Sequence, residues 1–165
     1  MSEQRILFVE SPIGAIELQE MNGFLTGLNF REKRKQSAAH PGAVLSACAR
    51  QLEEYFAGKR KVFDLLPDLD GTPFQREVWR ALQTVPFGTT ASYGEIARRI
   101  GRPAAVRAVG AANGRNPVSI IIPCHRVVGT DGGLTGYGGG LWRKEWLLRH
   151  ERKYADPDGG LFPDR

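Results

Sequence analysis

The sequence predicts an α+β fold in two parts, with a sheet-and-helix part over residues 1–70 and a mainly helical part over 71–152. Short β-type runs gather near the N-terminus, whereas helix-start signals gather in the second half. A linker rich in Pro and Asp, over 67–71, separates the two. We expect residues 153–165 to form a flexible tail.

In the first part, β-branched and apolar runs separated by turn residues predict strands that are followed by a helix. The strands are expected over 5–10, 15–19 and 24–30, and the helix over 41–57. The helix carries an apolar stripe formed by Leu45, Cys48, Leu52 and Phe56. Because this stripe has helical spacing, Cys48 is expected in the core. Residues 61–66 are expected to return as a further strand.

The second part opens on strong helix signals. Thr72 can cap a helix that begins at Pro73, and the S-x-x-E pattern over 92–95 can open another that ends at Gly101. A third helix is expected over 104–113. The two helices that flank Gly101 resemble a helix-turn-helix, and the second is slim because most of its side chains are small.

Charge and composition narrow the choice of partner and compartment. The formal net charge of +5 permits an anionic partner. Six arginines crowd the region around the helix pair, and this favours nucleic acid: Arg98, Arg99, Arg102, Arg107, Arg115 and Arg126. No apolar run approaches the length of a membrane span, and residues 1–5 lack a signal-peptide layout. We therefore expect a cytoplasmic protein with no membrane partner.

The most informative segment is Pro123-Cys124-His125-Arg126-Val127, which follows an apolar run over 119–122. The run predicts a buried strand that Pro123 ends, leaving Cys124 at a turn. A thiol becomes nucleophilic when a cation or an imidazole stabilises its thiolate, so His125 and Arg126 favour a reactive Cys124. The alternatives are a structural cysteine and a cysteine hydrolase, although the local signatures of the hydrolases are missing.

Other chemistries find less support. Only two cysteines are present, so a disulfide framework is not expected and a reducing compartment fits. The cysteines and the three histidines lack the paired spacing of metal sites, and we expect neither a metal nor a cofactor. The glycine-rich stretch over 130–140 contains no phosphate-loop motif, and we expect it to pass close to a ligand. A last helix is expected over 141–151.

Together these features resemble the O6-alkylguanine-DNA alkyltransferase family. The resemblance rests on the residues at 92–97, 107–110, 116–117, 123–127, 139–140, 144–148 and 150–151, and less distinctively on 11–14 and 55–56. It implies a ribonuclease-H-like sheet-plus-helix domain followed by a mainly helical, winged-helix-type DNA-binding domain. It also implies a DNA repair protein with methylated-DNA–protein-cysteine S-methyltransferase activity. Such a protein flips O6-alkylguanine out of duplex DNA and transfers the alkyl group irreversibly to its own cysteine.

The resemblance implies four catalytic residues. Cys124 would attack the alkyl carbon, and His125 would generate its thiolate through a water. Glu151 would orient His125, as the third member of a triad does. The hydroxyl of Tyr93 would serve N3 of the base, where it helps to stabilise the charge that develops on the guanine.

The resemblance also implies how DNA is held. Attack inside a stacked duplex is geometrically impossible, so the nucleotide must be flipped out. Arg107 would fill the vacated stack, while Ala105 and Ala108 let their helix approach the minor groove. Arg115 is expected to contact DNA as well.

Four further residues would shape the pocket for the flipped base. Asn116 would brace the active-site turn, and Val127, Tyr137 and Gly138 would line the pocket. Because a thioether is a poor leaving group, the protein would be consumed after one turnover. The expected partner is double-stranded DNA that contains O6-alkylguanine, bound by a monomer.

The sequence leaves open whether O4-methylthymine is also repaired and whether molecules associate cooperatively on DNA. Two alternative functions share the scaffold: a catalytically inactive alkyltransferase-like protein and a helix-turn-helix regulator. The presence of Cys124 argues against the first, and it would be incidental to the second.

Overall fold

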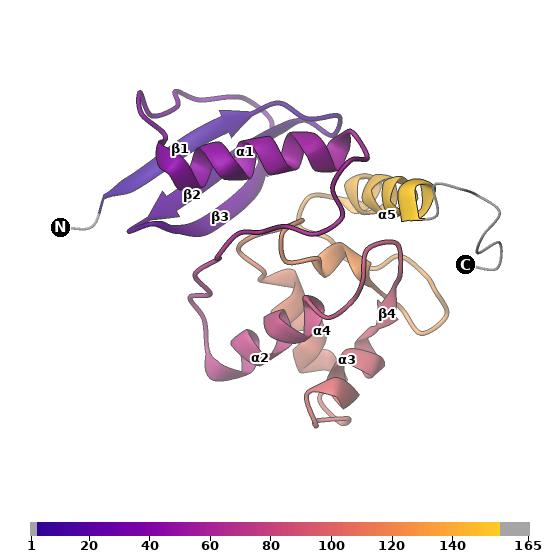
Figure 1. The fold of residues 1–165 in the computed structure, drawn as a ribbon. Coiled ribbons are helices and arrows are strands. Elements are labelled where there is room, and N and C mark those ends of the chain that lie inside the picture. The colour runs from indigo at the N-terminus through magenta and orange to yellow at the C-terminus, as the bar shows by residue number, and fades with distance from the viewer. Residues whose placement is uncertain (1–2, 156–165) are drawn as a thin grey trace.

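A computed structural model describes residues 3–155 of the chain. Its N-terminal elements are β1 (Gln4–Val9), β2 (Ala15–Met21), β3 (Phe24–Arg31) and α1 (Gly42–Phe56). The strands form an antiparallel sheet in the order β1-β2-β3, and α1 covers one of its faces (Figure 1). The first three expected strands and the expected helix are confirmed, with ends displaced by one or two residues.

A tight hairpin joins β2 to β3 and fixes the pairs next to the turn, before a bulge between Gln19 and Glu20 shifts the register. Asn22 and Gly23 both have positive φ angles, 54° and 84°, as a two-residue type I′ turn requires. The turn pairs Met21 with Phe24. Buried apolar side chains from the sheet and from α1 join one core, which includes Ile16, Leu18, Leu25, Leu28, Leu45, Cys48 and Leu52. Cys48 therefore lies in the core, as expected, and burial raises the pKa of its thiol to about 12.

The second part of the chain is mainly helical. Its elements are α2 (Pro73–Leu82), β4 (Ala91–Ser92), α3 (Tyr93–Arg99), α4 (Val106–Gly114), the 3₁₀ helix η1 (Cys124–Arg126), β5 (Val127–Val128) and α5 (Leu141–Ala155). Thr72 caps α2 by accepting a hydrogen bond from the backbone N of Gln75, whose side chain accepts one from Thr72 in return. Ser92 caps α3 by accepting from the backbone N of Glu95. Both expected helix starts are confirmed.

The expected helix-turn-helix pair is present. The helices α3 and α4 pack against each other, and Gly101 between them takes a φ of 73° that favours glycine (Figure 1). The second helix begins at Val106, two residues later than expected. The reason is a turn over 102–105, in which the backbone N of Ala105 donates to Arg102 O.

The last helix, α5, joins the two parts of the molecule. His150 Nε2 lies 2.7 Å from the Tyr55 carbonyl of α1, and Arg143 Nε donates to Ile13 O at 2.7 Å. The helix continues to Ala155, three residues beyond the boundary expected at 152, and the rest of the expected tail lies outside the described residues. Within residues 3–155, no helix is both long and apolar enough to cross a bilayer.

Two expected strands are wrong. Residues 61–66 form no strand, and this segment meets the sheet only at an isolated bridge between Pro67 and Leu25. Its side chains do alternate, with Phe63 and Leu65 half-buried and Val62 and Leu66 76% and 74% exposed, but no neighbouring strand in the described part of the chain pairs with the segment along its length. Residues 119–122 form a tight turn, because Ile120 adopts a φ of 71° and reverses the chain. The apolar run there indicates that the side chains are buried and does not indicate an extended backbone.

Candidate active site

The turn that precedes Cys124 is held by one side chain. Asn116 Nδ2 donates to Ile122 O at 2.7 Å, while Asn116 Oδ1 accepts from the backbone N of Val118 at 2.9 Å. This bridge spans Ile120, whose positive φ is rare for a β-branched residue and is held by the surrounding contacts. The turn delivers Cys124 to the start of η1, where the thiol is only 4% exposed.

Cys124 lines a cavity of about 180 Å³. Residues from three regions share its wall: Asn29, Phe30 and Arg31 from β3, Asn113, Gly114, Asn116 and Ser119 from α4 and the turn, and 136–139 from the glycine-rich stretch. Tyr137 and Gly138 are among them, as expected. The Tyr137 hydroxyl is buried and has no hydrogen-bond partner in the described part of the chain. The cavity thus combines a thiol, an aromatic ring and close backbone, which suits a planar polar ligand.

A lysine, and not Arg126, is the cation that faces the thiol. Burial raises the pKa of Cys124, whereas Asn116 and the charge of Lys144 lower it. Lys144 is fully buried, and its Nζ donates to Val127 O at 2.6 Å and to Thr135 O at 2.8 Å. Burial in turn lowers the pKa of Lys144, while the neighbouring thiolate raises it. This ammonium group can stabilise a thiolate at Cys124.

His125 and Glu151 form a buried pair. His125 Nε2 lies 2.6 Å from Glu151 Oε2, and both side chains are at most 1% exposed. His125 and Arg126 hold the pKa of Glu151 well below its usual range, so the carboxylate is ionised and Nε2 must be the donor. The other ring nitrogen, Nδ1, therefore carries the lone pair, and it has no hydrogen-bond partner among residues 3–155. Burial lowers the pKa of His125, which keeps the ring neutral and able to accept a proton.

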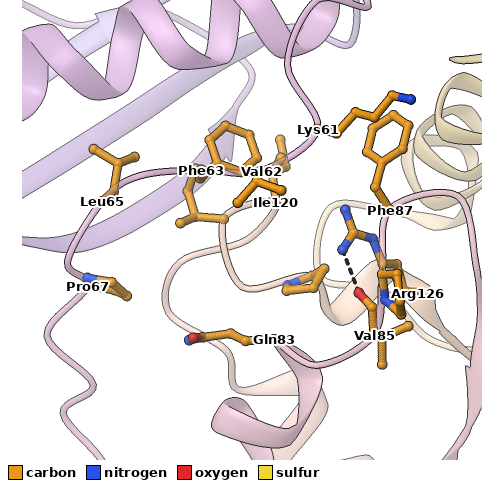
Figure 2. Close-up of a pocket in the computed structure, with 13 residues that line it drawn as sticks. Lys61, Val62, Phe63, Leu65, Pro67, Gln83, Val85, Phe87, Ile120 and Arg126 are labelled. Atoms are coloured by element: carbon orange, nitrogen blue, oxygen red, sulfur yellow. Dashed lines mark hydrogen bonds between the residues drawn. The ribbon is translucent and has the colours of Figure 1, made fainter. Parts of the chain in front are cut away.

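Arg126 is the counter-ion of this pair. Its Nε donates to Glu151 Oε1 at 2.8 Å and its Nη2 to Oε2 at 3.0 Å, which is the bidentate geometry that arginine favours. Its third nitrogen, Nη1, donates to Val85 O at 2.7 Å. Figure 2 shows this bond beside Phe87, in a second cavity of about 260 Å³ that shares no lining residue with the first. Because Arg126 is only 6% exposed, it does not belong to the arginine cluster expected to meet nucleic acid.

The remaining predicted residues lie outside the cavity wall. The Tyr93 hydroxyl is 2.7 Å from Thr135 Oγ1, next in the chain to the lining residue Gly136. On α4, Arg107 and Ala108 are exposed, and so is Arg115 just after the helix, while Ala105 is half-buried at its start. Val127 is buried in β5, where it pairs with Ala91, and its carbonyl accepts from Lys144.

Sequence reasoning missed three parts of the site. Tyr55 reaches Glu151 from α1, although the apolar stripe placed Phe56 on the buried face. Lys144 lies within a motif of the family resemblance, but nothing in its local sequence marks it as buried. Asn113 Nδ2 contacts Cys124 O at 3.4 Å from the end of α4. The available signal for Asn113 was a polar residue near the end of a helix made mostly of small and apolar residues.

Residues 3–155 contain no cluster of His, Cys, Asp or Glu side chains that could hold a metal ion.

Two family models match the chain, one for each part. The model described as "6-O-methylguanine DNA methyltransferase, ribonuclease-like domain" matches residues 5–68, and the model described as "6-O-methylguanine DNA methyltransferase, DNA binding domain" matches 73–153. Together with the fold, they define the class as a two-part α+β protein with a ribonuclease-like and a DNA-binding domain.

Individual relatives agree over nearly the whole length. A methylated-DNA–protein-cysteine methyltransferase of Mycobacterium tuberculosis H37Rv is 51% identical over 159 residues, covering 93% of this chain and 96% of the relative. One from Methanosarcina acetivorans is 49% identical over 147 residues, with coverage of 86% and 94%. The crystal structure of M. tuberculosis O6-methylguanine methyltransferase superposes with a TM-score of 0.85 at 48% identity, covering 97% and 99% of the two chains. A structure of the M. tuberculosis protein in complex with DNA reaches 0.82 at 51% identity, with coverage of 89% and 92%. The chain belongs to the 6-O-methylguanine DNA methyltransferase family.

Proposed function

We propose that this protein repairs O6-alkylguanine in double-stranded DNA by transferring the alkyl group irreversibly to Sγ of Cys124. The observation that carries the proposal is the site itself. A buried thiol faces a pocket, and the His125–Glu151 pair beside it leaves His125 Nδ1 free to accept a proton. Family membership supports the substrate class, since the relatives are named for methylated DNA and protein cysteine.

The chemistry is a displacement at a saturated carbon. His125 Nδ1 takes the thiol proton of Cys124 through a water, and the resulting thiolate attacks the alkyl carbon. The S–C bond forms as the C–O6 bond breaks, and the electron pair of the broken bond stays on the guanine. Lys144 stabilises the thiolate, and Glu151 stabilises the imidazolium that forms on His125. The Tyr93 hydroxyl donates to N3 of the base once the base has entered.

The same site supports single turnover. A thioether is a poor leaving group, and the residues that line the described cavity include neither a second thiol nor a carboxylate. Nothing in that wall can release the alkyl group from Cys124. The protein is therefore consumed, one molecule for each lesion.

The helix pair α3–α4 supplies the DNA-binding surface. The exposed side chains of Arg107 and Arg115 and the small side chains of Ala105 and Ala108 suit a helix that lies in the minor groove. Arg107 fills the gap left by the flipped nucleotide, and the base enters the pocket braced by Asn116. In this proposal the first domain ends near residue 70 and the second begins near residue 71, as the sequence predicts. We place the reaction in the cytoplasm, where a reducing environment keeps Cys124 free.

The test is an intact-mass measurement. Purified protein is mixed with duplex DNA that carries one O6-methylguanine, and we expect one added methyl group for each protein, located on Cys124. Cys124→Ala should abolish transfer and keep DNA binding. Cys48→Ala is the matched control, because Cys48 is equally buried but lies in the core of the other part, and it should transfer normally.

Three outcomes would reject the proposal. Repeated turnover would indicate a hydrolytic enzyme, and the absence of an adduct would indicate an inactive DNA-binding protein. An adduct on Cys48 would place the acceptor elsewhere. The same assay with O4-methylthymine in the duplex reports whether that base is accepted too.

A further inference from the structure

Tyr55 connects the N-terminal part to the buried pair of the active site. Its hydroxyl lies 2.7 Å from Glu151 Oε2, although 96 residues separate the two in the chain. Both side chains are at most 1% exposed. Because Glu151 is ionised, the hydroxyl must be the donor. Burial and the charge of Glu151 raise the pKa of Tyr55 well above its usual range, so the hydroxyl keeps its proton at neutral pH.

The ring of Tyr55 is clamped, and this fixes the direction of its hydroxyl. Phe56 and Phe87 meet it edge-on, with ring centroids 5.3 and 6.1 Å away. Phe63 and the imidazole of His150 pack against it at 5.4 and 5.1 Å. His150 also contacts the Tyr55 carbonyl at 2.7 Å. The donor is therefore preorganised and does not adapt to the carboxylate.

Oxygen Oε2 of Glu151 is shared among three donors. His125 Nε2 lies at 2.6 Å, the Tyr55 hydroxyl at 2.7 Å and Arg126 Nη2 at 3.0 Å. Each donor that binds the oxygen withdraws charge that would otherwise attract the proton of His125. Loss of the Tyr55 hydroxyl would leave the same carboxylate with more charge to direct at His125. It would also remove the tie between the carboxyl group and the clamped ring, so that only His125 and Arg126 would position Oε2.

We propose that Tyr55 is a positioning residue of alkyl transfer, through which helix α1 of the N-terminal part sets the orientation and proton affinity of the His125–Glu151 pair. The inference rests on the proposed function. It means that the ribonuclease-like part contacts, through Tyr55, the buried pair that acts in the DNA-binding part.

The test is Tyr55→Phe, which keeps the clamped ring and removes only the hydroxyl. The charged groups that act on His125 are Glu151 and Lys144 from α5 and Arg126 from η1, while Tyr55 from α1 and Tyr137 from the glycine-rich stretch act on Glu151. Of these, the variant changes Tyr55 alone. The second-order rate of methyl transfer is measured from pH 5 to pH 9, beside wild type and beside Tyr154→Phe. Tyr154 lies one helical turn beyond Glu151 on α5 and is not one of its hydrogen-bond partners.

We expect Tyr55→Phe to slow transfer roughly tenfold at neutral pH and to move the acid limb of the profile upward by about one pH unit. The sign follows from the carboxylate. With one donor fewer, it holds a proton on His125 more strongly, so the base is lost at a higher pH. Tyr154→Phe should reproduce the wild-type profile. Incorporation of a fluorotyrosine at position 55, which is a stronger donor, should move the acid limb in the opposite direction.

The outcomes are separable. Wild type that transfers no methyl group rejects the proposed function itself. If wild type transfers and Tyr55→Phe matches it in rate and acid limb, the role of Tyr55 is refuted. A uniform loss of rate at all pH values, with the acid limb unmoved, also refutes it, because that is the signature of packing damage. Should the phenylalanine variant fail to fold, an unmoved acid limb in the fluorotyrosine protein is the refuting result.

Discussion

Neutralising Glu151 is the sharpest perturbation of the buried network. In Glu151→Gln the side chain keeps its shape and loses its charge. The carboxylate accepts hydrogen bonds from His125, Tyr55 and Arg126, and a longer one of 3.3 Å from the backbone N of Gly88. After the substitution, the guanidinium of Arg126 stays buried without a countercharge. The amide can also turn its own donor toward His125, which would favour the wrong tautomer of the ring.

The structure sets the size of the effect. Leaving one partner of a buried ion pair uncompensated costs about 3–5 kcal/mol. For a chain of this size, that corresponds to a fall in Tm of roughly 10 °C. The transfer rate should fall on the order of 10⁴-fold, as for triads whose orienting carboxylate becomes an amide.

The difference in stability between wild type and Glu151→Gln also depends on pH, and its direction follows from the pKa of Glu151. The folded pKa of Glu151 is lowered, so its contribution to stability is fully present above the unfolded pKa of about 4.3. The contribution is lost as pH falls below that value toward the folded pKa. The gap in Tm between wild type and Glu151→Gln should therefore be constant near pH 7 and should narrow below about pH 4.

Thermal melts and single-turnover transfer measure the two effects. Glu145→Gln is the matched control, since Glu145 lies on the same helix, is half exposed and pairs only with Arg149 at 2.9 Å among the described residues. An exposed pair of this kind contributes at most about 1 kcal/mol, so the control should melt within a few degrees of wild type. If Glu151→Gln melts and reacts like Glu145→Gln, the carboxylate neither holds Arg126 nor orients His125, and the reasoning fails.

Two further predictions concern the thiol and the DNA. Lys144→Met removes the ammonium group that lowers the pKa of Cys124, so transfer at pH 7 should fall about tenfold and recover in part at higher pH. An iodoacetamide titration of Cys124 should show the raised thiol pKa directly, and an unchanged titration would contradict the role of Lys144. Arg107→Ala should slow transfer from duplex DNA about tenfold and leave the reaction with free O6-methylguanine base unchanged, because only the duplex needs a flipped nucleotide. Equal losses with both substrates would show that Arg107 acts on the pocket instead.

Local chemistry was enough to predict most elements of the fold. The capping pattern at Thr72 and Pro73 placed the start of α2 correctly, since both residues act within one helical turn. The Asn22-Gly23 dipeptide marked a turn between two strands because few other pairs tolerate two positive φ angles. Signals of this kind depend on residues that are close in the chain, so no tertiary information was needed to interpret them.

The segment before Cys124 shows where such reasoning fails. Its apolar run is equally compatible with a buried strand and with a buried turn, since both hide their side chains. Asn116 decides between them. Its amide group satisfies the backbone of Val118 and Ile122 that a neighbouring strand would otherwise satisfy. A single side chain that makes the hydrogen bonds of a neighbouring strand produces no periodic pattern in the sequence.

The relay was predictable only in part for a similar reason. Cys124 and His125 are adjacent in the chain, and the motif identifies them together. Glu151 followed from the family resemblance, whereas Tyr55 and Lys144 meet the site only because α5 packs between the two parts of the molecule. The sequence does not distinguish a buried lysine from an exposed one. It also does not distinguish an Arg126 that faces the thiol from one that binds Glu151.

The positions of these charges explain why the reactive segment 123–127 depends on charged side chains from α5. In the proposed reaction, proton transfer from Cys124 to His125 creates a thiolate and an imidazolium inside the protein, and each must be offset where it forms. Arg126 cannot offset the thiolate, since both of its donors toward the relay are bound to Glu151. Lys144 serves the thiolate and Glu151 serves the imidazolium, and both project from α5. Arg126 then limits how strongly Glu151 attracts the proton, so that the imidazole stays neutral until the thiol gives its proton up. In this proposal the cation of the motif therefore acts on the base, and the cation that acts on the nucleophile comes from α5.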